Sequence, residues 1–180
     1  MSEALVGSRI DIRPLAVHEA EARLDELANI LVDAVAHGAS VNFLSGFSHR
    51  EGRAFWLSQL PGLAAGEKQL FVADDGSRLV GTVLLMFAPQ PNAPHRADIG
   101  KMLVLSSCRR RGLGARLLAA AEEAALASGH TLLLLDTESG SEGERLYRSR
   151  GWIECGRVPD YFIRTDGRLG DTIMFYKHLR

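Results

Sequence analysis

The sequence has only two cysteines, Cys108 and Cys155, in 180 residues. Two thiols cannot form the disulfide framework of a small secreted domain, and their scarcity suits a reducing compartment. No apolar run approaches the roughly 20 residues that cross a bilayer, and residues 1–9 lack the apolar centre of a signal peptide. We therefore expect a cytoplasmic protein with no membrane partner.

An excess of charge of either sign is also missing. Lys and Arg total 21 against 22 Asp and Glu, for a net charge of −1, which argues against nucleic acid as the partner. The six histidines show no metal-binding spacing, so no metal site is expected. A hydrophobic fraction of 46% is typical of a globular protein, and we expect one domain over residues 9–180.

Hydrophobic periodicity predicts alternating strands and helices. The expected strands cover 9–15, 69–73, 78–88, 96–105, 131–136, 152–158 and 172–179. The expected helices cover 19–36, 55–63 with an interruption at Pro61, 111–128 and 142–150. The order β-α-α-β-β-β-α-β-α-β-β predicts a mixed α/β fold in which helices flank a central mixed sheet.

The most informative stretch lies between an apolar strand and a helix and reads Arg109-Arg110-Arg111-Gly112-Leu113-Gly114. Glycines let the backbone approach a ligand closely, and a helix start offers unpaired N–H groups and a positive dipole end. The expected ligand is a pyrophosphate. No Lys-Ser/Thr pair follows, so this is no P-loop, and Leu117 stands where a dinucleotide fingerprint needs a small residue. A solvated basic helix start is the alternative interpretation.

The pattern Arg109-x-x-Gly112-x-Gly114 resembles the coenzyme-A loop of the GNAT family of N-acetyltransferases, and the predicted element order is similar to theirs. Three local stretches, 37–43, 135–141 and 166–169, look like the tabtoxin-resistance acetyltransferases, which acetylate an amino-acid toxin. The resemblance implies direct transfer of acetyl from acetyl-CoA to a small-molecule amine. It also implies that a homodimer is possible.

The same resemblance implies which residues bind the cofactor. The loop would supply Arg109, Arg110, Arg111, Gly112, Leu113, Gly114 and Ala115. The preceding strand, at Met102, Leu103 and Val104, would pair with pantetheine through its main chain and supply an oxyanion donor, for which Leu103 is a candidate. Tyr147 stands four residues before Gly151-Trp152, the family spacing for a tyrosine that reaches the sulfur and protonates the leaving thiolate.

Amide formation needs a base to take the amine proton. Asp136 ends an apolar strand and is a candidate base or ammonium anchor, although a capping role in the following loop is the alternative. Asp98 is a second candidate. Counting by twos puts it on the same face as Met102 and Val104, where a carboxylate is costly unless it lines a cleft. A bulge, common in this strand of the family, would re-aim that face.

Other interpretations stay open. Cys108 precedes the basic loop and could act as an acyl-enzyme nucleophile, although inert burial fits cysteine better. Ser40, Asn42 and Phe43 are candidates for acceptor binding, while Phe43 fits the core equally well. At the level of function, the alternatives are a non-catalytic acyl-CoA sensor and a nucleic-acid-binding module that uses the loop arginines and Arg116.

Overall fold

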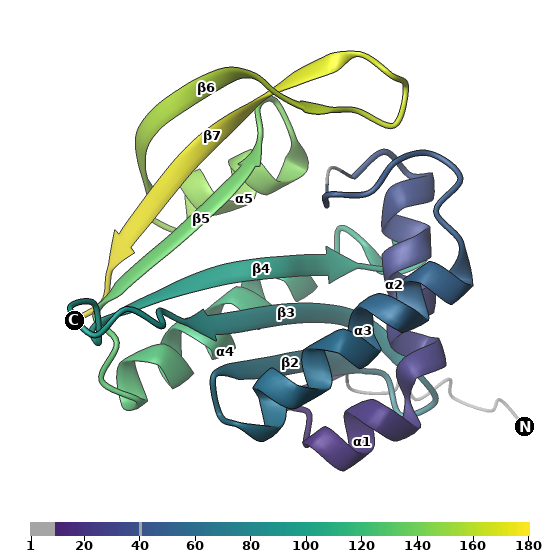
Figure 1. Cartoon of the computed structure of the whole chain (residues 1–180), viewed down its shortest axis with the longest axis horizontal. Coiled ribbons are helices and arrows are strands. Elements are labelled where there is room, and N and C mark those ends of the chain that lie inside the picture. The colour runs from purple at the N-terminus through teal and green to yellow at the C-terminus, as the bar shows by residue number, and fades with distance from the viewer. Residues whose placement is uncertain (1–9, 40) are drawn as a thin grey trace, which may run out of the picture.

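In the computed structural model, which describes residues 10–39 and 41–180, one seven-stranded mixed sheet forms the centre of the molecule (Figure 1). The strand order is β1-β2-β3-β4-β5-β7-β6. The strands are β1 (Asp11–Pro14), β2 (Lys68–Asp74), β3 (Leu79–Phe87), β4 (Arg96–Val104), β5 (Leu132–Glu138), β6 (Ile153–Ile163) and β7 (Leu169–His178). The predicted mixed α/β class with helices around a central sheet is confirmed.

In the described residues, five α-helices cover the two faces of this sheet. They are α1 (Val17–Ala22), α2 (Leu24–Ala36), α3 (His49–Ala64), α4 (Leu113–Ala127) and α5 (Glu142–Ser149). The first three lie on one face, and α4 crosses the other (Figure 1). Leu117 of α4 packs so closely on Gly81 of β3 that a Cβ there would come within 3.0 Å of it. Each face of the central strands is therefore buried under helices.

The N-terminal helices differ from the prediction in two ways. The expected helix 19–36 is broken at Arg23, where φ is −113° and the guanidinium binds Glu26 and Asp74. The next helix begins at His49, six residues before the predicted start. Ser48 caps it by accepting from the Glu51 N–H while the Glu51 carboxylate binds the Ser48 N–H, a capping box. It continues through Pro61 to Ala64, so the predicted interruption is wrong.

The feature that opens the sheet is the separation of β4 from β5. These parallel strands pair only from Arg96–Leu132 to Asp98–Leu134, and beyond that point they diverge, as Figure 1 shows. β5 remains paired with β7 up to Glu138–Thr172. The edge of β4 that faces β5 is consequently unpaired from about Ile99 onward, and a slot passes through the sheet.

β4 also carries a bulge. Gly100 pairs with Leu84 and Leu103 with Thr82, so β4 has one residue more than β3 in this interval, and Lys101 has a φ of 47°. The bulge reverses the alternation of the strand. Asp98 and Leu103 lie on the α2–α3 face, whereas Val104, opposite Gly81, lies on the α4 face. The expectation from counting by twos, that Asp98 shares a face with Met102 and Val104, is wrong for this reason.

Candidate functional site

A cleft of about 1210 Å³ occupies the slot between β4 and β5. Its walls on the α4 face come from the loop before α4 and from α5, and on the α2–α3 face from residues 37–39, 41 and 42. Small-molecule pockets are usually about 300–1000 Å³. A cleft of this size that reaches both faces can hold one long ligand and a second, smaller one that approaches it from the opposite side.

The predicted pyrophosphate loop lines this cleft. Gly112 caps α4 in the left-handed region with a φ of 74°, and the first helical bond of the turn runs from the Arg116 N–H to the Gly112 carbonyl. Within the described residues, the N–H groups of positions 110–115 donate to no protein acceptor. Several free amides at the positive end of a 15-residue helix form an anion site.

The three arginines of the loop lie in different surroundings. Arg109 turns back and donates from Nε to the Val104 carbonyl at 3.3 Å. Arg110 is left-handed with a φ of 63°, is largely exposed and lies 3.9 Å from Glu142. Arg111 is exposed but does not line the cleft. Leu113, Gly114 and Ala115 do line it, and a Cβ on Gly114 would come within 3.2 Å of Leu146, so this glycine lets α5 pack against the loop.

The free edge of β4 provides main-chain groups inside the cleft. The Leu105 N–H donates to the Val80 carbonyl of β3, and the Leu103 carbonyl also approaches β3. Because alternate residues of a strand point their main-chain groups to opposite sides, those of Met102 and Val104 point toward the slot. Of the three residues predicted to pair with pantetheine, Met102 and Val104 are the ones whose main-chain groups face the slot, although the Val104 carbonyl already accepts from Arg109, and Leu103 is the one turned away.

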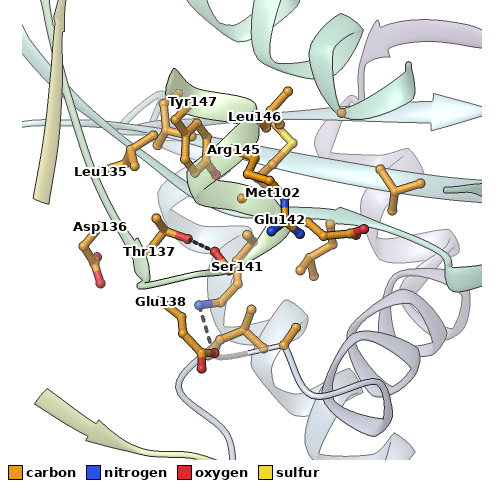
Figure 2. Close-up of a pocket in the computed structure, with 18 of the residues that line it drawn as sticks. Met102, Leu135, Asp136, Thr137, Glu138, Ser141, Glu142, Arg145, Leu146 and Tyr147 are labelled. Carbon is orange, nitrogen blue, oxygen red and sulfur yellow. Dashed lines mark hydrogen bonds between the residues drawn. The ribbon is translucent and has the colours of Figure 1, made fainter. Parts of the chain in front are cut away.

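Tyr147 enters the cleft from α5. Its side chain is 6% exposed and packs on Trp152 and Phe175, with ring centroids 5.8 and 6.2 Å apart. Figure 2 shows Tyr147 among the labelled side chains that line the cleft. Burial, and secondarily the charge of Asp136, raise the pKa of the Tyr147 hydroxyl well above its usual range, so the group stays protonated. Its oxygen has no hydrogen-bond partner within the described part of the chain, which leaves the proton available to a ligand.

Ser141 stabilises the start of α5 below Tyr147. Its hydroxyl accepts from the Glu144 N–H at 3.1 Å and lies 3.2 Å from the Thr137 hydroxyl, the contact marked by a dashed line in Figure 2. These bonds fix the turn that joins β5 to α5. They therefore hold Tyr147 in place against the slot.

The two candidate carboxylates share the other face of the sheet. Asp98 pairs with Leu134, and Asp136 follows Leu134 by two residues, so both side chains project toward the α2–α3 face and line the cleft. Asp136 is exposed, accepts from the Thr172 hydroxyl at 3.1 Å and lies across β5 from Thr137 (Figure 2). Asp98 is half-buried. Desolvation raises the pKa of its carboxyl, and the like charge of Asp136 raises it further, against the lowering effect of Arg96.

The three residues predicted for acceptor binding differ in whether they line the cleft. Ser40 lies outside the described residues. Asn42 is exposed, has a φ of 69° and lines the cleft. Phe43 does not line it; its ring packs on Phe47 and Phe55 with centroids 4.1 and 5.5 Å away, against the hydrophobic core. Of the three, Asn42 is the one whose placement at the cleft can be described.

Cys108, the alternative nucleophile, is 6% exposed at the end of the turn after β4. Its sulfur lies 3.7 Å from the Ser107 hydroxyl. No three side chains among His, Cys, Asp and Glu come together as a ligand set for a metal in residues 10–39 and 41–180. In the same ranges, no helix is long and apolar enough to cross a membrane.

Two features of the cleft were missed from the sequence. Lys101 lines it from the bulge, and Arg164 lies 3.0 Å from Glu138, which links the loop between β6 and β7 to the end of β5. Lys101 stands inside a strand of otherwise mostly apolar residues, and this was the available signal. The ion pair of Arg164 forms because two segments far apart in the chain approach each other. The sequence contains no signal for that approach.

Known proteins resemble this chain in sequence and in structure. The model of the acetyltransferase (GNAT) family matches residues 32–152, about two thirds of the chain. An N-acetyltransferase from Staphylococcus aureus has a similar structure at 18% sequence identity, with a TM-score of 0.79 over 96% of this chain and 100% of that one. A ribosomal-protein-alanine N-acetyltransferase from Brucella melitensis is 27% identical, with a TM-score of 0.75 over 94% and 99% of the two chains.

A protein from Salmonella typhimurium, whose structure contains acetyl-CoA as its cofactor, is 18% identical to this chain. The two superimpose with a TM-score of 0.75 over 96% of this chain and 95% of that one. The three neighbours have nearly the same length as this chain, so the match covers a whole fold rather than a shared fragment.

Proposed function

This chain belongs to the acetyltransferase (GNAT) family, and on that premise we propose that it transfers the acetyl group of acetyl-CoA to the amino group of a small molecule. The observation that carries the proposal is the slot between β4 and β5. It joins an anion site at the start of α4 to two carboxylates on the opposite face. Two substrates that enter from opposite faces can meet there and react directly.

The residues of the α4 face fit coenzyme A. The free amides of positions 110–115, with Arg109 and Arg110, would hold the diphosphate, and Met102 and Val104 would pair with the pantetheine amides as an added strand does. Acetyl-CoA supplies the activated acyl group as a thioester. The Met102 N–H, which points into the slot, is a better placed donor to the developing oxyanion than that of Leu103.

On the opposite face, Asp98 and Asp136 have different roles toward the amine: one accepts a proton from it, and the other attracts its positive charge. An alkylammonium ion must lose a proton before its nitrogen can attack. Asp98, whose pKa is raised by desolvation, accepts that proton directly or through water, because a raised pKa makes a carboxylate a stronger base. Asp136 is more exposed and attracts the ammonium ion by its charge.

Tyr147 completes the transfer of protons. As the bond between acyl carbon and sulfur breaks, the sulfur leaves as a thiolate and takes the proton of the Tyr147 hydroxyl. The pKa of that hydroxyl, raised by burial, keeps it protonated over the working range of pH. The first amine proton ends on Asp98 and the phenol proton on sulfur. The second proton, which the nitrogen loses as the amide forms, passes to the tyrosinate or to solvent, and exchange with solvent restores both side chains.

The acceptor is tested by a screen. Purified protein, acetyl-CoA and a panel of amino acids, polyamines, aminoglycosides and peptide N-termini are assayed for free thiol release. Turnover of small amines supports the proposal, with an amino-acid-like toxin as the favoured class from the resemblance in sequence. Turnover of peptides alone would favour the activity named for the Brucella relative. Tight binding of acetyl-CoA without any turnover would favour a sensor.

A further inference from the structure

Lys101 is a cation in the acceptor half of the cleft. Its ammonium nitrogen is 5.1 Å from the centroid of the Phe55 ring and 5.8 Å from that of Phe43, and it donates to the Val41 carbonyl at 3.4 Å. These neighbours come from α3 and from the segment after α2. The β4 bulge aims the side chain this way, and the Lys101 carbonyl is fixed by the Thr82 hydroxyl at 2.8 Å.

The positive charge of the Lys101 ammonium group has no nearby carboxylate to balance it in the described part of the chain. Within the described residues, no carboxylate lies within 4.0 Å of it, whereas Arg164 and Arg110 at the same cleft have Glu138 and Glu142. Burial lowers the pKa of Lys101, and the more distant charge of Asp136 offsets that effect in part. A half-buried cation with one long hydrogen bond has donors to spare for a ligand.

The position also limits which ligand it can meet. Lys101 lies on the α2–α3 face with Asp98 and Asp136, while the anion site of α4 lies on the other face. The phosphates proposed to bind at α4 are thus across the sheet from it. An acceptor amine drawn to Asp98 and Asp136 would have the rest of its body beside Lys101 and Asn42.

We propose that Lys101 binds a carboxylate of the acceptor, so that the substrate class is amino acids whose amine faces Asp98 and Asp136. The inference rests on the proposed function, because it concerns the second substrate of the same reaction. Opposite charges at the two ends of the acceptor side orient a zwitterion in one direction. A plain amine lacks the group that Lys101 pairs with and is oriented less well.

The test compares matched acceptors. kcat/KM is measured for a panel of L-amino acids and the corresponding L-amino-acid amides, which keep the amine and side chain but lose the negative charge. The wild type should prefer the acids by about 10- to 100-fold, the size expected for a charge-assisted hydrogen bond. In Lys101→Met the preference should disappear through loss of activity on the acids, while activity on the amides stays within about threefold.

Two variants control for indirect effects. Lys101→Arg keeps the charge and should retain most of the preference, and Lys68→Met, on β2 outside the cleft, should keep all of it. Unchanged acetyl-CoA affinity and melting temperature in Lys101→Met show that the variant is folded. Amides used as well as acids by the wild type, or an equal preference in Lys101→Met, would overturn the inference and leave the transferase intact. No acetyl-CoA binding and no thiol release with any amine would instead overturn the proposed function, and this inference with it.

Discussion

The substitution Tyr147→Phe tests the role of one proton, that of the Tyr147 hydroxyl. The substitution removes a single oxygen atom from a ring that is 6% exposed and leaves its packing on Trp152 and Phe175 in place. Within the described residues that oxygen makes no hydrogen bond, so no partner loses one. We expect the free energy of unfolding to change by less than about 1 kcal/mol, which shifts the melting temperature by no more than about 4 °C in a protein of this size.

The effect on turnover should be much larger. General acid catalysis contributes about 10²–10⁴-fold, and because a thiolate leaves readily, we expect a loss near 100-fold in kcat. The thiol-release assay with a saturating acceptor measures kcat, and calorimetric titration measures acetyl-CoA affinity. Since the proton moves only as the bond to sulfur breaks, kcat and kcat/KM should fall together and the affinity should stay within about twofold.

Tyr176→Phe is the matched control. Tyr176 lies half-buried on β7 outside the cleft, and its ring packs on His178 at 5.7 Å. This variant should keep wild-type kcat. Turnover by Tyr147→Phe within about threefold of wild type, with normal affinity, would refute the assignment of Tyr147 as the acid.

Three further predictions concern the base, the loop and the core. In the wild type, the acidic limb of the plot of kcat/KM against pH should lie above the usual pKa range for Asp, because the pKa of Asp98 is raised. Asp98→Asn should remove this limb. Asp136→Asn should move it to lower pH, because a like charge near Asp98 is lost. Because the folded pKa of Asp98 is raised, its contribution to stability is lost as pH rises, so Asp98→Asn should melt higher than wild type at pH 7. Gly112→Ala should lose about 1–2 kcal/mol of stability and bind acetyl-CoA more weakly. Gly129, which follows the other end of α4, is also left-handed, so Gly129→Ala should lose similar stability but keep its affinity for acetyl-CoA. Equal affinities in both variants would contradict the loop assignment. Trp56→Phe should cost about 1–3 kcal/mol in chemical denaturation, because the buried indole donates to a main-chain carbonyl of α2 at 2.9 Å, and should leave kcat unchanged.

The site that the sequence reveals best is the loop before α4. Its signal is local, since Gly112 and Gly114 set the turn and the following apolar periodicity sets the helix. Asp136 and Tyr147 could be placed approximately for the same reason, one near the end of a strand and one on a short helix, although β5 continues two residues beyond Asp136, to Glu138. The cleft that both residues line could not be predicted, because it depends on where β4 and β5 diverge.

Periodicity alone could not give the face of Asp98 or the placement of Lys101, and only the resemblance in sequence suggested a bulge in this strand. One extra residue in β4 reverses which side chains share a face of the sheet. The alternation of apolar and polar residues along a strand does not reveal such a bulge. The break before α2 likewise depends on Asp74, 51 residues from Arg23 in the chain. Contacts between distant segments decide these details, and residue periodicity records only local order.

The central claim is that the free amides at the start of α4 hold the diphosphate of coenzyme A, and calorimetric titration of the wild type tests it directly. Acetyl-CoA is compared with S-acetylpantetheine, which keeps the thioester and pantetheine but lacks the diphosphate and the 3′-phosphoadenosine attached to it, and with 3′-phosphoadenosine, whose own affinity shows how much of the difference comes from that part. We expect acetyl-CoA to bind at least about 100-fold more tightly, because several charge-assisted hydrogen bonds are lost in the shorter ligand. Equal affinities, or no affinity for acetyl-CoA, would contradict the account.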